Sequence, residues 1–517
     1  MSGETGALAA AKPKAQDHHR WCLLQAFRGG VRRRARHATT ALATIAGFLA
    51  TACTALPSLP FAEAATEPSP DGAAEHIGEQ GESVGAAAWW KSFDDPDLDR
   101  VVALVLEANF DIATAVARVE QARAKARVAV AARLPMVQAA FGASEFDAPT
   151  NVGFGAQLQE LGGDAFALFD VPLPDRLDQA TYSAGLDFAY EIDFWGRDTS
   201  AARAAHSERL ASEADLRAAR MGVVAETVAT YLEIVDLGRQ HGYAKETVRI
   251  LGEWAVLAED RYERGVGDVR DVYAIRRNLR DAEAALPGIT ARRTDAQGRL
   301  QVLAGGSDAE LVADLSESMP SPALTDSPVV ISAETLAQRP DVAAARQRLA
   351  AAGFALDARR AALLPSLSLS GSIGLQSSQT DVWFDPDQWF RNLSSNLLAP
   401  VFQGGRLRGN VALAKANLRE ATSTYGKAVA TATAEVGAAL AALESSRERA
   451  SLLASRAGEA DAEKVLQERR YAAGIADYRT VLGAAQLEVA ALAALAAGER
   501  ELAYARLALH RAVGGAW

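Results

Sequence analysis

The side chains that most often hold metals or act as nucleophiles are few and scattered in this sequence. The two cysteines, Cys22 and Cys53, both lie near the N-terminus. The seven histidines do not have the spacing of a metal site. Gly265-Val266-Gly267 lacks the later glycine and the preceding strand of a nucleotide-binding loop. We therefore expect no catalytic residue, no metal and no cofactor, and we expect that the protein is not an enzyme.

A pattern of charged and aromatic residues around a glycine occurs twice. Each copy has Arg-Tyr, a glycine three residues later and an aspartate three beyond that: Arg261, Tyr262, Gly265 and Asp268, then Arg470, Tyr471, Gly474 and Asp477. Alanine-rich helical sequence runs into and out of each copy. A glycine at that place ends a helix, so each copy is predicted to be the tip of a long helical hairpin.

The composition indicates close-packed helices and an acidic body. The 517 residues are 49% hydrophobic but only 7% aromatic, and alanine predominates, which suits helices that approach closely. Residues 1–52 contain eight basic and two acidic side chains, and the formal net charge of the whole chain is −11. The rest of the chain therefore carries −11 − 6, or −17. Such an acidic body argues against nucleic acid as a partner.

The N-terminus is predicted to be an export signal. Arginines between residues 32 and 36 precede an uncharged, mostly apolar run, Thr39–Ala52, which is too short to span a bilayer. The run ends in Leu49-Ala50-Thr51-Ala52-Cys53, which resembles a bacterial lipobox whose large apolar residue lies one place early. We expect residues 1–52 to be a signal peptide, Cys53 to be lipidated and residues 53–88 to be a flexible tether. The alternative is an ordinary signal that is cut near Ala62-Glu63-Ala64.

The first half of the body is predicted to contain helices around a pair of strands. Asp95 and Pro96 suit the N-cap and the first position of a helix better than a metal site. Period-2 alternation indicates strands, and long proline-free sequence indicates the helix that leads to the tip. The predicted elements are a helix over 96–133, extended segments over 136–146 and 182–194, and hairpin helices over 198–262 and up to 303, the last interrupted at Pro287-Gly288.

The second half is predicted to repeat this order. An irregular connector over 307–338 separates a first repeat, 89–306, from a second, 339–517. The second repeat is predicted to have a helix over 340–363, strands from 366 to 373 and from 392 to 402, and hairpin helices over 407–471 and up to 512.

The correspondence between the halves can be checked by offsets. Leu134-Pro135 matches Leu364-Pro365 at an offset of 230, and Gly196-Arg197 matches Gly405-Arg406 at an offset of 209. The second offset then holds without a gap through both tips. The change of 21 falls between the two strands of the first half, so the loop that joins them is longer than its equivalent. An internal two-fold repeat therefore explains the whole body.

Four alternating strands per chain predict a shared membrane barrel. Such strands have one apolar and one polar face, as transmembrane β-strands do. Four strands cannot close a barrel, and open sheet edges are not tolerated in lipid, so three copies would supply twelve strands. The alternative is a soluble sheet covered by helices, but the helices are far too long for that. We expect no transmembrane helix after residue 53, because no stretch there reads as 18 or more apolar residues.

An ordered set of short motifs connects this chain with a known family. The motifs are Trp89-Trp90 with Phe93 and Asp95-Pro96, Arg123-Ala124, Leu134-Pro135, Tyr190-Glu191-Ile192-Asp193 with Gly196-Arg197, Arg339-Pro340-Asp341, Pro400-Val401-Phe402 with Gly404-Gly405-Arg406, the two tips, and Gly514-Gly515-Ala516-Trp517. Over residues 85–517 the chain resembles the outer-membrane efflux factors, or TolC-like channels, and specifically their lipoprotein branch, the NodT family.

The resemblance implies a fold, a function and partners. The fold is a mainly α-helical trimeric tunnel, in which a shared twelve-stranded outer-membrane β-barrel continues into a periplasmic α-barrel of coiled-coil helices. The function is passive exit of substrates through the outer membrane, as one component of a tripartite efflux system. The implied partners are two further copies of the chain, outer-membrane lipid, a periplasmic adaptor protein and an inner-membrane pump of the resistance–nodulation–division (RND) type.

The tips are the predicted functional site. The eight motif residues listed above are the expected adaptor contacts at the periplasmic end. In the family, inward-facing Asp and Arg after the second tip close the channel, but here Gly483 and Gln486 occupy those places. The candidates to constrict or latch the tip instead are Arg270, Asp271, Asp477 and Arg479, with Asp268 beside them. The alternative is that each of these is simply a solvated tip residue.

A second class of function stays open from the sequence alone. A non-channel periplasmic scaffold, a lipoprotein coiled coil that bridges partners, would also use long helices. It would not need two pairs of alternating strands at repeated positions, so the sequence favours the channel. An adhesin-like trimer is a third possibility, but the chain has no passenger domain.

Overall fold

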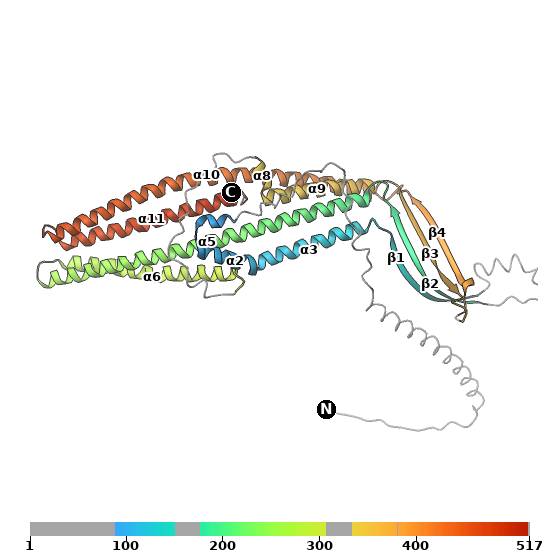
Figure 1. The fold of residues 1–517 in the computed structure, drawn as a ribbon, viewed down its shortest axis with the longest axis horizontal. Helices are drawn as coiled ribbons and strands as arrows, with labels where there is room; N and C mark the ends of the chain where they lie inside the picture. The colour runs from blue at the N-terminus through green and yellow to red at the C-terminus, as the bar shows by residue number, and fades with distance from the viewer. Residues whose placement is uncertain (1–87, 150–175, 307–332, 380, 515–517) are drawn as a thin grey trace, which may run out of the picture. The chain divides into compact units, whose positions relative to one another are not determined.

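The computed structural model describes residues 88–149, 176–306, 333–379 and 381–514, all within one compact unit that spans Ser83–Trp517 (Figure 1). The predicted signal peptide, the lipidation site Cys53 and nearly all of the tether lie outside the described residues, as does most of the predicted connector.

The first helical segment begins as predicted but is two helices. After a short 3-10 turn, η2 (Trp89–Phe93), come α2 (Pro96–Ala108) and α3 (Phe110–Ala131). Asp95 is the N-cap of α2, because its Oδ1 accepts hydrogen bonds from the backbone N–H groups of Asp97 and Leu98 at 2.8 and 3.2 Å. The predicted continuous helix over 96–133 is wrong, because Asn109 has an extended backbone and caps α3 in the same way.

Two helical hairpins of equal dimensions form most of the described chain. The first is α5 (Arg197–Glu263) and α6 (Val269–Leu303), and the second is α10 (Arg406–Ala472) and α11 (Tyr478–Ala512). The longer helices each have 67 residues and the shorter ones 35. At 1.5 Å per residue, a 67-residue helix is about 100 Å long. The equal lengths confirm the internal repeat.

The predicted interruption of α6 at Pro287-Gly288 is wrong. α6 is continuous with Pro287 inside it. Proline removes one backbone hydrogen bond from a helix, but Pro287 lies on the exposed side, where the released carbonyl can reach water. Ile289, Ala296 and Leu300 are buried on the opposite side. This packing keeps α6 a single element.

The strands form one antiparallel sheet in the order β1-β2-β3-β4. They are β1 (Met136–Pro149), β2 (Arg176–Ile192), β3 (Ser366–Ser377) and β4 (Trp389–Leu398). The predicted strands over 182–194 and 392–402 overran at their ends, because Phe194 and Phe402 lie beyond β2 and β4. The strands predicted over 136–146 and 366–373 stopped short of the ends of β1 and β3. Asp193 lies between β2 and α5, and its Oδ2 accepts a hydrogen bond from the Thr199 N–H in the first turn of α5 at 2.8 Å.

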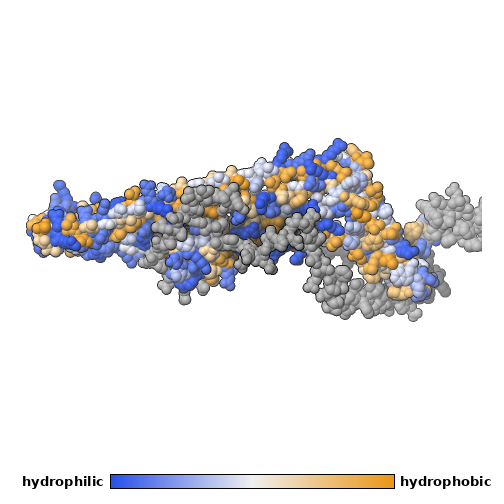
Figure 2. Space-filling view, turned by 45° about the horizontal axis from the view of Figure 1, so that its top comes forward, coloured by the Kyte–Doolittle hydropathy of each residue, from blue (hydrophilic) through white to orange (hydrophobic). Residues whose placement is uncertain are grey.

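The register gives the sheet one apolar and one polar face. Directly opposed residues in antiparallel strands point to the same face. One row across the sheet is Val137, Phe188, Gly371 and Leu393, and the adjacent row is Gln138, Asp187, Ser372 and Asn392. Val137 and Leu393 are 64% and 70% exposed in the single chain. Figure 2 shows hydrophobic residues gathered over the strands and the adjoining helix ends. The sheet therefore has the two-faced character predicted for membrane strands.

α5 is the centre of the helical packing. It contacts α2, α3 and α6 of its own half, and also α9 (Pro340–Ala361) and α11 of the second half. The largest apolar cluster includes Leu98, Tyr231 and Leu300, and the Tyr231 hydroxyl donates a hydrogen bond to Asp95 Oδ2 at 2.7 Å. Trp89 stacks on His510 with ring centroids 5.1 Å apart, which fixes η2 against α11.

An equivalent side-chain hydrogen bond to the backbone occurs in each repeat. In the first half, Asn109 Nδ2 donates a hydrogen bond to the Leu303 carbonyl at 2.9 Å. In the second half, Arg339 Nη1 donates to the Ala512 carbonyl at 2.8 Å. Asn109 and Arg339 each precede a short helix, and the two carbonyls end the second helix of each hairpin. The six-residue helix α8 (Ala333–Gln338) comes just before Arg339, inside the range predicted to be irregular.

The expectation that no segment after residue 53 resembles a transmembrane helix is wrong. Among the described residues, α11 is long and apolar enough to cross a membrane by length and composition alone. Its apolar character has a packing explanation, because α11 contacts both α10 and α5. Leu482, Ala491 and Leu509 are among its buried residues.

Candidate functional site at the hairpin tips

The two tips have the same backbone geometry. Gly265 and Gly474 both have φ of +73°, a left-handed conformation that side chains with a Cβ adopt only with strain. The N–H after each glycine donates to the carbonyl of the motif arginine, at 2.9 Å from Val266 to Arg261 and at 3.0 Å from Ile475 to Arg470. This is the Schellman arrangement that ends a helix. The glycines therefore form the turns between α5 and α6 and between α10 and α11.

The motif aspartates cap the helices that leave the tips. Asp268 Oδ1 accepts a hydrogen bond from the Arg270 N–H at 2.9 Å, and Asp477 Oδ1 accepts one from the Arg479 N–H at 3.1 Å. The other carboxylate oxygen of Asp477, Oδ2, accepts a hydrogen bond from Arg261 Nη1 at 2.8 Å. This ion pair joins the tips of the two hairpins, which are distant in the sequence. Both side chains are more than a third exposed, so the pair is worth about 0.2–1 kcal/mol.

A second contact joins the hairpins about two turns further along α5. The Tyr478 hydroxyl of α11 donates to Glu253 Oε2 of α5 at 3.0 Å. Arg249 forms ion pairs with Glu253 and Glu246 on the same helix. The hydrogen bond to Glu253, together with burial, raises the pKa of Tyr478 above its ordinary value. The rings of Tyr478 and Tyr471 lie 5.2 Å apart, which links this contact to the second tip.

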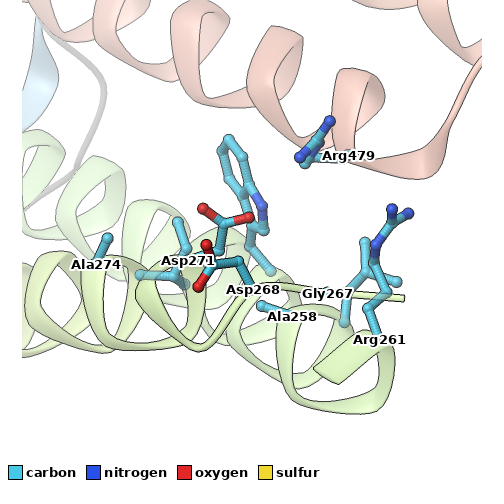
Figure 3. A pocket seen from close by; sticks show the side chains of 10 residues that line it. Ala258, Arg261, Gly267, Asp268, Asp271, Ala274 and Arg479 are labelled. Atoms are coloured by element: carbon cyan, nitrogen blue, oxygen red, sulfur yellow. The ribbon is translucent and has the colours of Figure 1, made fainter. Parts of the chain in front are cut away.

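The tips enclose a small charged cleft of about 130 Å³ (Figure 3). Asp268 and Asp271 point into it from the first hairpin, and Arg479 approaches from α11 of the second. Arg261 lies at one end of the cleft, and Trp254 is a further lining residue. Opposite charges from the two hairpins therefore face one shared space.

Not all predicted site residues meet. Arg261, Asp268, Asp271 and Arg479 line the cleft, and Asp477 bonds to Arg261 beside it. Others are exposed around the tips: Arg270, Arg470, Tyr262 and Tyr471, the last two about half-exposed.

Gly483, expected from the family resemblance to replace an acidic residue, lies near α5. A Cβ on Gly483 would lie 4.0 Å from Cη2 of Trp254. A Cβ at position 483 would therefore just reach van der Waals contact with the α5 indole. Sequence reasoning missed Trp254, Glu253 and Tyr478. Trp254 could have been noticed, because it is a large aromatic residue in an alanine-rich helix, about two turns before the tip.

A layer of buried charge lies further from the tips and was also missed. Asp236 of α5 is 2% exposed, and Arg500 Nη1 of α11 donates to its Oδ2 at 2.7 Å. One turn along, Arg239 Nη2 donates to Glu499 Oε2 at 2.7 Å. The two pairs run in opposite senses, so they fix α5 and α11 in one register. No group of three or more His, Cys, Asp or Glu side chains in the described ranges is arranged to hold a metal ion.

Comparisons with known proteins agree with this architecture. The family model of outer membrane efflux proteins matches residues 101–306 and 331–515. The chain is 32% identical to the pyoverdine export outer membrane protein OpmQ of Pseudomonas putida over 432 residues, which cover 83% of this chain and 88% of OpmQ.

Two solved channels have the same fold. The CmeC outer membrane channel of Campylobacter jejuni is 26% identical with a TM-score of 0.73, over 83% of this chain and 88% of CmeC. The outer membrane protein VceC of Vibrio cholerae is 25% identical with a TM-score of 0.71, over 83% of this chain and 98% of VceC.

The chain therefore belongs to the outer membrane efflux protein family. The fold class, the outer-membrane location and the efflux-channel function predicted from the sequence are confirmed. The relatives are efflux channels, and channels of this kind are not enzymes. The scaffold and adhesin alternatives have no support among these relatives.

Proposed function

We propose that the chain acts as a homotrimer whose three sheets close one twelve-stranded barrel. The observation that carries this proposal is the four-stranded sheet with one mainly apolar face. The outer edges of β1 and β4 have no strand partner in the described residues. Backbone groups at such edges cannot remain unpaired in lipid, whereas three copies would pair every edge.

In this assembly the helical hairpins continue the barrel into the periplasm as a tunnel. An adaptor protein and an RND-type inner-membrane pump would deliver substrate to its open end, as expected of the outer-membrane component of a tripartite system. The adaptor would contact the six hairpin tips, through Arg261, Tyr262, Gly265 and Asp268 and through Arg470, Tyr471, Gly474 and Asp477. The protein itself would catalyse no reaction.

The tips would also be the gate. In the resting state, the Arg261–Asp477 ion pair and the Tyr478–Glu253 hydrogen bond tie one hairpin to the other. Asp271 and Arg479 face the cleft between them, and Arg270 lies on the exposed side. Opening the tunnel would require the hairpins to separate, and these contacts oppose that separation.

One experiment tests the assembly and the channel together. The full-length chain is purified in detergent, its mass is measured by light scattering, and it is then inserted into a planar bilayer. We expect a mass of three chains, heat-modifiable migration on a denaturing gel and single-channel current. A single-chain mass, or a trimer that never conducts, would contradict the proposal, and the second result would favour the scaffold.

The N-terminal proposal needs a separate test. Lipid on Cys53 would tether each copy to the membrane through residues 53–88. Mass spectrometry of the mature N-terminus distinguishes a lipid-modified Cys53 from an unmodified terminus after Ala64. The division of the body into repeats over 89–306 and 339–517, joined by residues 307–338, is likewise a proposal, supported by the equal hairpins.

A further inference from the structure

The two halves of the chain make unequal contacts although their helices correspond. α5 packs on α6 of its own hairpin and also on α9 and α11 of the second half. α10, its equivalent, packs on α11 and α9. In the described chain, α10 has no packing of comparable extent on α3 or α6, the equivalents of α9 and α11. One side of α10 and one side of α6 therefore lack the neighbour that the repeat gives to α5 and α11.

The contact between α5 and α11, here called the hairpin interface, has an apolar centre and a charged end. Its centre contains Ile250, Leu482 and Val489, which are buried, with Tyr243, Trp254, Leu257, Tyr478 and Ala485 packed around them. Its end at the tips is the Arg261–Asp477 ion pair. The offset of 209 translates each of these positions onto α10 or α6.

Four translated positions are apolar but exposed. Tyr243 and Leu257 of α5 correspond to Leu452 and Leu466 of α10, while Tyr478 and Leu482 of α11 correspond to Val269 and Tyr273 of α6. The exposed fractions of these four equivalents are 66%, 53%, 37% and 66% in the same order. Large apolar side chains are thus exposed on α10 and α6 at the positions that are packed in the hairpin interface.

Four other positions change from apolar to charged, with opposite signs on the two helices. Ile250 and Trp254 correspond to Glu459 and Glu463, both on α10. Ala485 and Val489 correspond to Arg276 and Arg280, both on α6. Each arginine also contacts a glutamate of its own hairpin, Arg276 with Glu259 and Arg280 with Glu283. The exposed sides of α10 and α6 are therefore complementary in charge.

The two residues of the Arg261–Asp477 ion pair have an arginine and an aspartate at the equivalent positions of the other hairpin. Arg261 corresponds to Arg470, and Asp477 corresponds to Asp268. Asp268 caps α6 with Oδ1 as Asp477 caps α11, and its side chain also borders the cleft within its own chain. Arg470 and Asp268 are both exposed.

We propose that α10 of one copy packs against α6 of the neighbouring copy, and that Arg470 forms an ion pair with Asp268 of that neighbour. This inference rests on the proposed homotrimer and specifies its subunit interface. Leu452 and Leu466 meet Val269 and Tyr273 there, and the acidic side of α10 faces the basic side of α6. Ion pairs within a chain then alternate with ion pairs between chains around the six tips. The subunit interface is the more polar of the two contacts.

Thiol cross-linking of the full-length protein tests this directly. A chain with Asp268→Cys and Arg470→Cys, treated with a short bismaleimide, should give covalent dimers and trimers on a denaturing gel. The matched control, Arg261→Cys with Asp477→Cys, should give a cross-link within one chain that migrates as a monomer. The parent chain with its native cysteines measures the background. Cross-linked monomers alone from the first variant, while light scattering shows an intact trimer, would overturn this inference but not the trimer.

A charge reversal gives a readout that does not depend on cysteine geometry. Arg470→Asp should lower the temperature at which the trimer dissociates in the parent chain. In a chain that already carries Asp268→Arg, the same substitution should raise that temperature, because opposite charges then face each other again. Equal lowering in both backgrounds would show that the two residues do not meet. A monomeric parent chain would refute the trimer and this interface together.

Discussion

The Arg261–Asp477 ion pair should hold the tunnel closed, and its removal should raise the resting conductance. Both side chains are partly exposed, so each pair contributes about 0.2–1 kcal/mol. Three pairs act on the same opening in a trimer, which gives about 0.6–3 kcal/mol in total if they add. Because 1.4 kcal/mol is tenfold in an equilibrium, Arg261→Ala should raise the open fraction by about 3-fold to about 150-fold.

Different substitutions distinguish the two roles of Asp477, which pairs with Arg261 and also caps α11. Asp477→Ala removes both the partner of Arg261 and the cap on Arg479, so it should have a larger effect than Arg261→Ala. Asp477→Asn keeps an oxygen for the cap and loses the charge, so it should resemble Arg261→Ala. Arg264→Ala is the matched control, since Arg264 pairs with Asp260 on its own helix and is 72% exposed.

The assay is the current through purified protein in planar bilayers at low ionic strength. High salt should raise the resting conductance of the parent protein beyond the bulk increase, because exposed ion pairs are screened. It should have less effect on Arg261→Ala. Unchanged resting conductance in Arg261→Ala and Asp477→Ala would refute the role of this pair. An increase in Arg264→Ala of the same size would show that any loss of tip charge suffices.

Three further predictions concern other contacts. Arg500→Ala leaves the carboxylate of Asp236 buried without its cation, and should lower the free energy of unfolding by about 3 kcal/mol in urea titrations; a change under 0.5 kcal/mol would contradict this. Gly474→Ala places a Cβ at φ of +73° and should cost about 1–2 kcal/mol in the same titration. The pKa of Tyr478 is higher in the folded protein than in the unfolded chain, because its hydroxyl donates to Glu253. The stability from this bond is complete below the unfolded pKa and is lost as pH rises through the folded pKa, so Tyr478→Phe should reduce the loss of tip closure at strongly alkaline pH, measured as resting conductance.

The sequence predicted the elements well because their patterns are long and repeated. The offset of 209 located both hairpins, and period-2 alternation located the sheet. The errors occurred where one side chain decides the outcome. Asn109 ends a helix by capping the next one, and Pro287 remains inside a helix because its exposed side reaches water. Neither effect can be read from periodicity.

The site was predictable in its parts but not in its connections. The motif predicted turn glycines and nearby charges at both tips. It did not predict that Arg261 would bond to Asp477, because that pairing depends on how α5 lies against α11. The same contact packs Trp254 against the cluster that includes Leu482 of α11 and places it beside Gly483. Contacts between helices that are distant in the sequence can be predicted only when the arrangement of the helices is known.

The unpaired edges of the sheet have a consequence for biogenesis. A single chain that entered the bilayer would expose the backbone groups along one side of β1 and of β4 to hydrocarbon, and each unsatisfied group costs several kcal/mol. The 10 residues of β4 alone would make this cost far greater than the net stability of a typical domain. If three copies close one barrel as proposed, lone subunits should therefore stay on the aqueous side of the membrane until three have met. Insertion would then be an all-or-none event for the trimer, and a damaged copy would arrest its two partners before they reach the lipid.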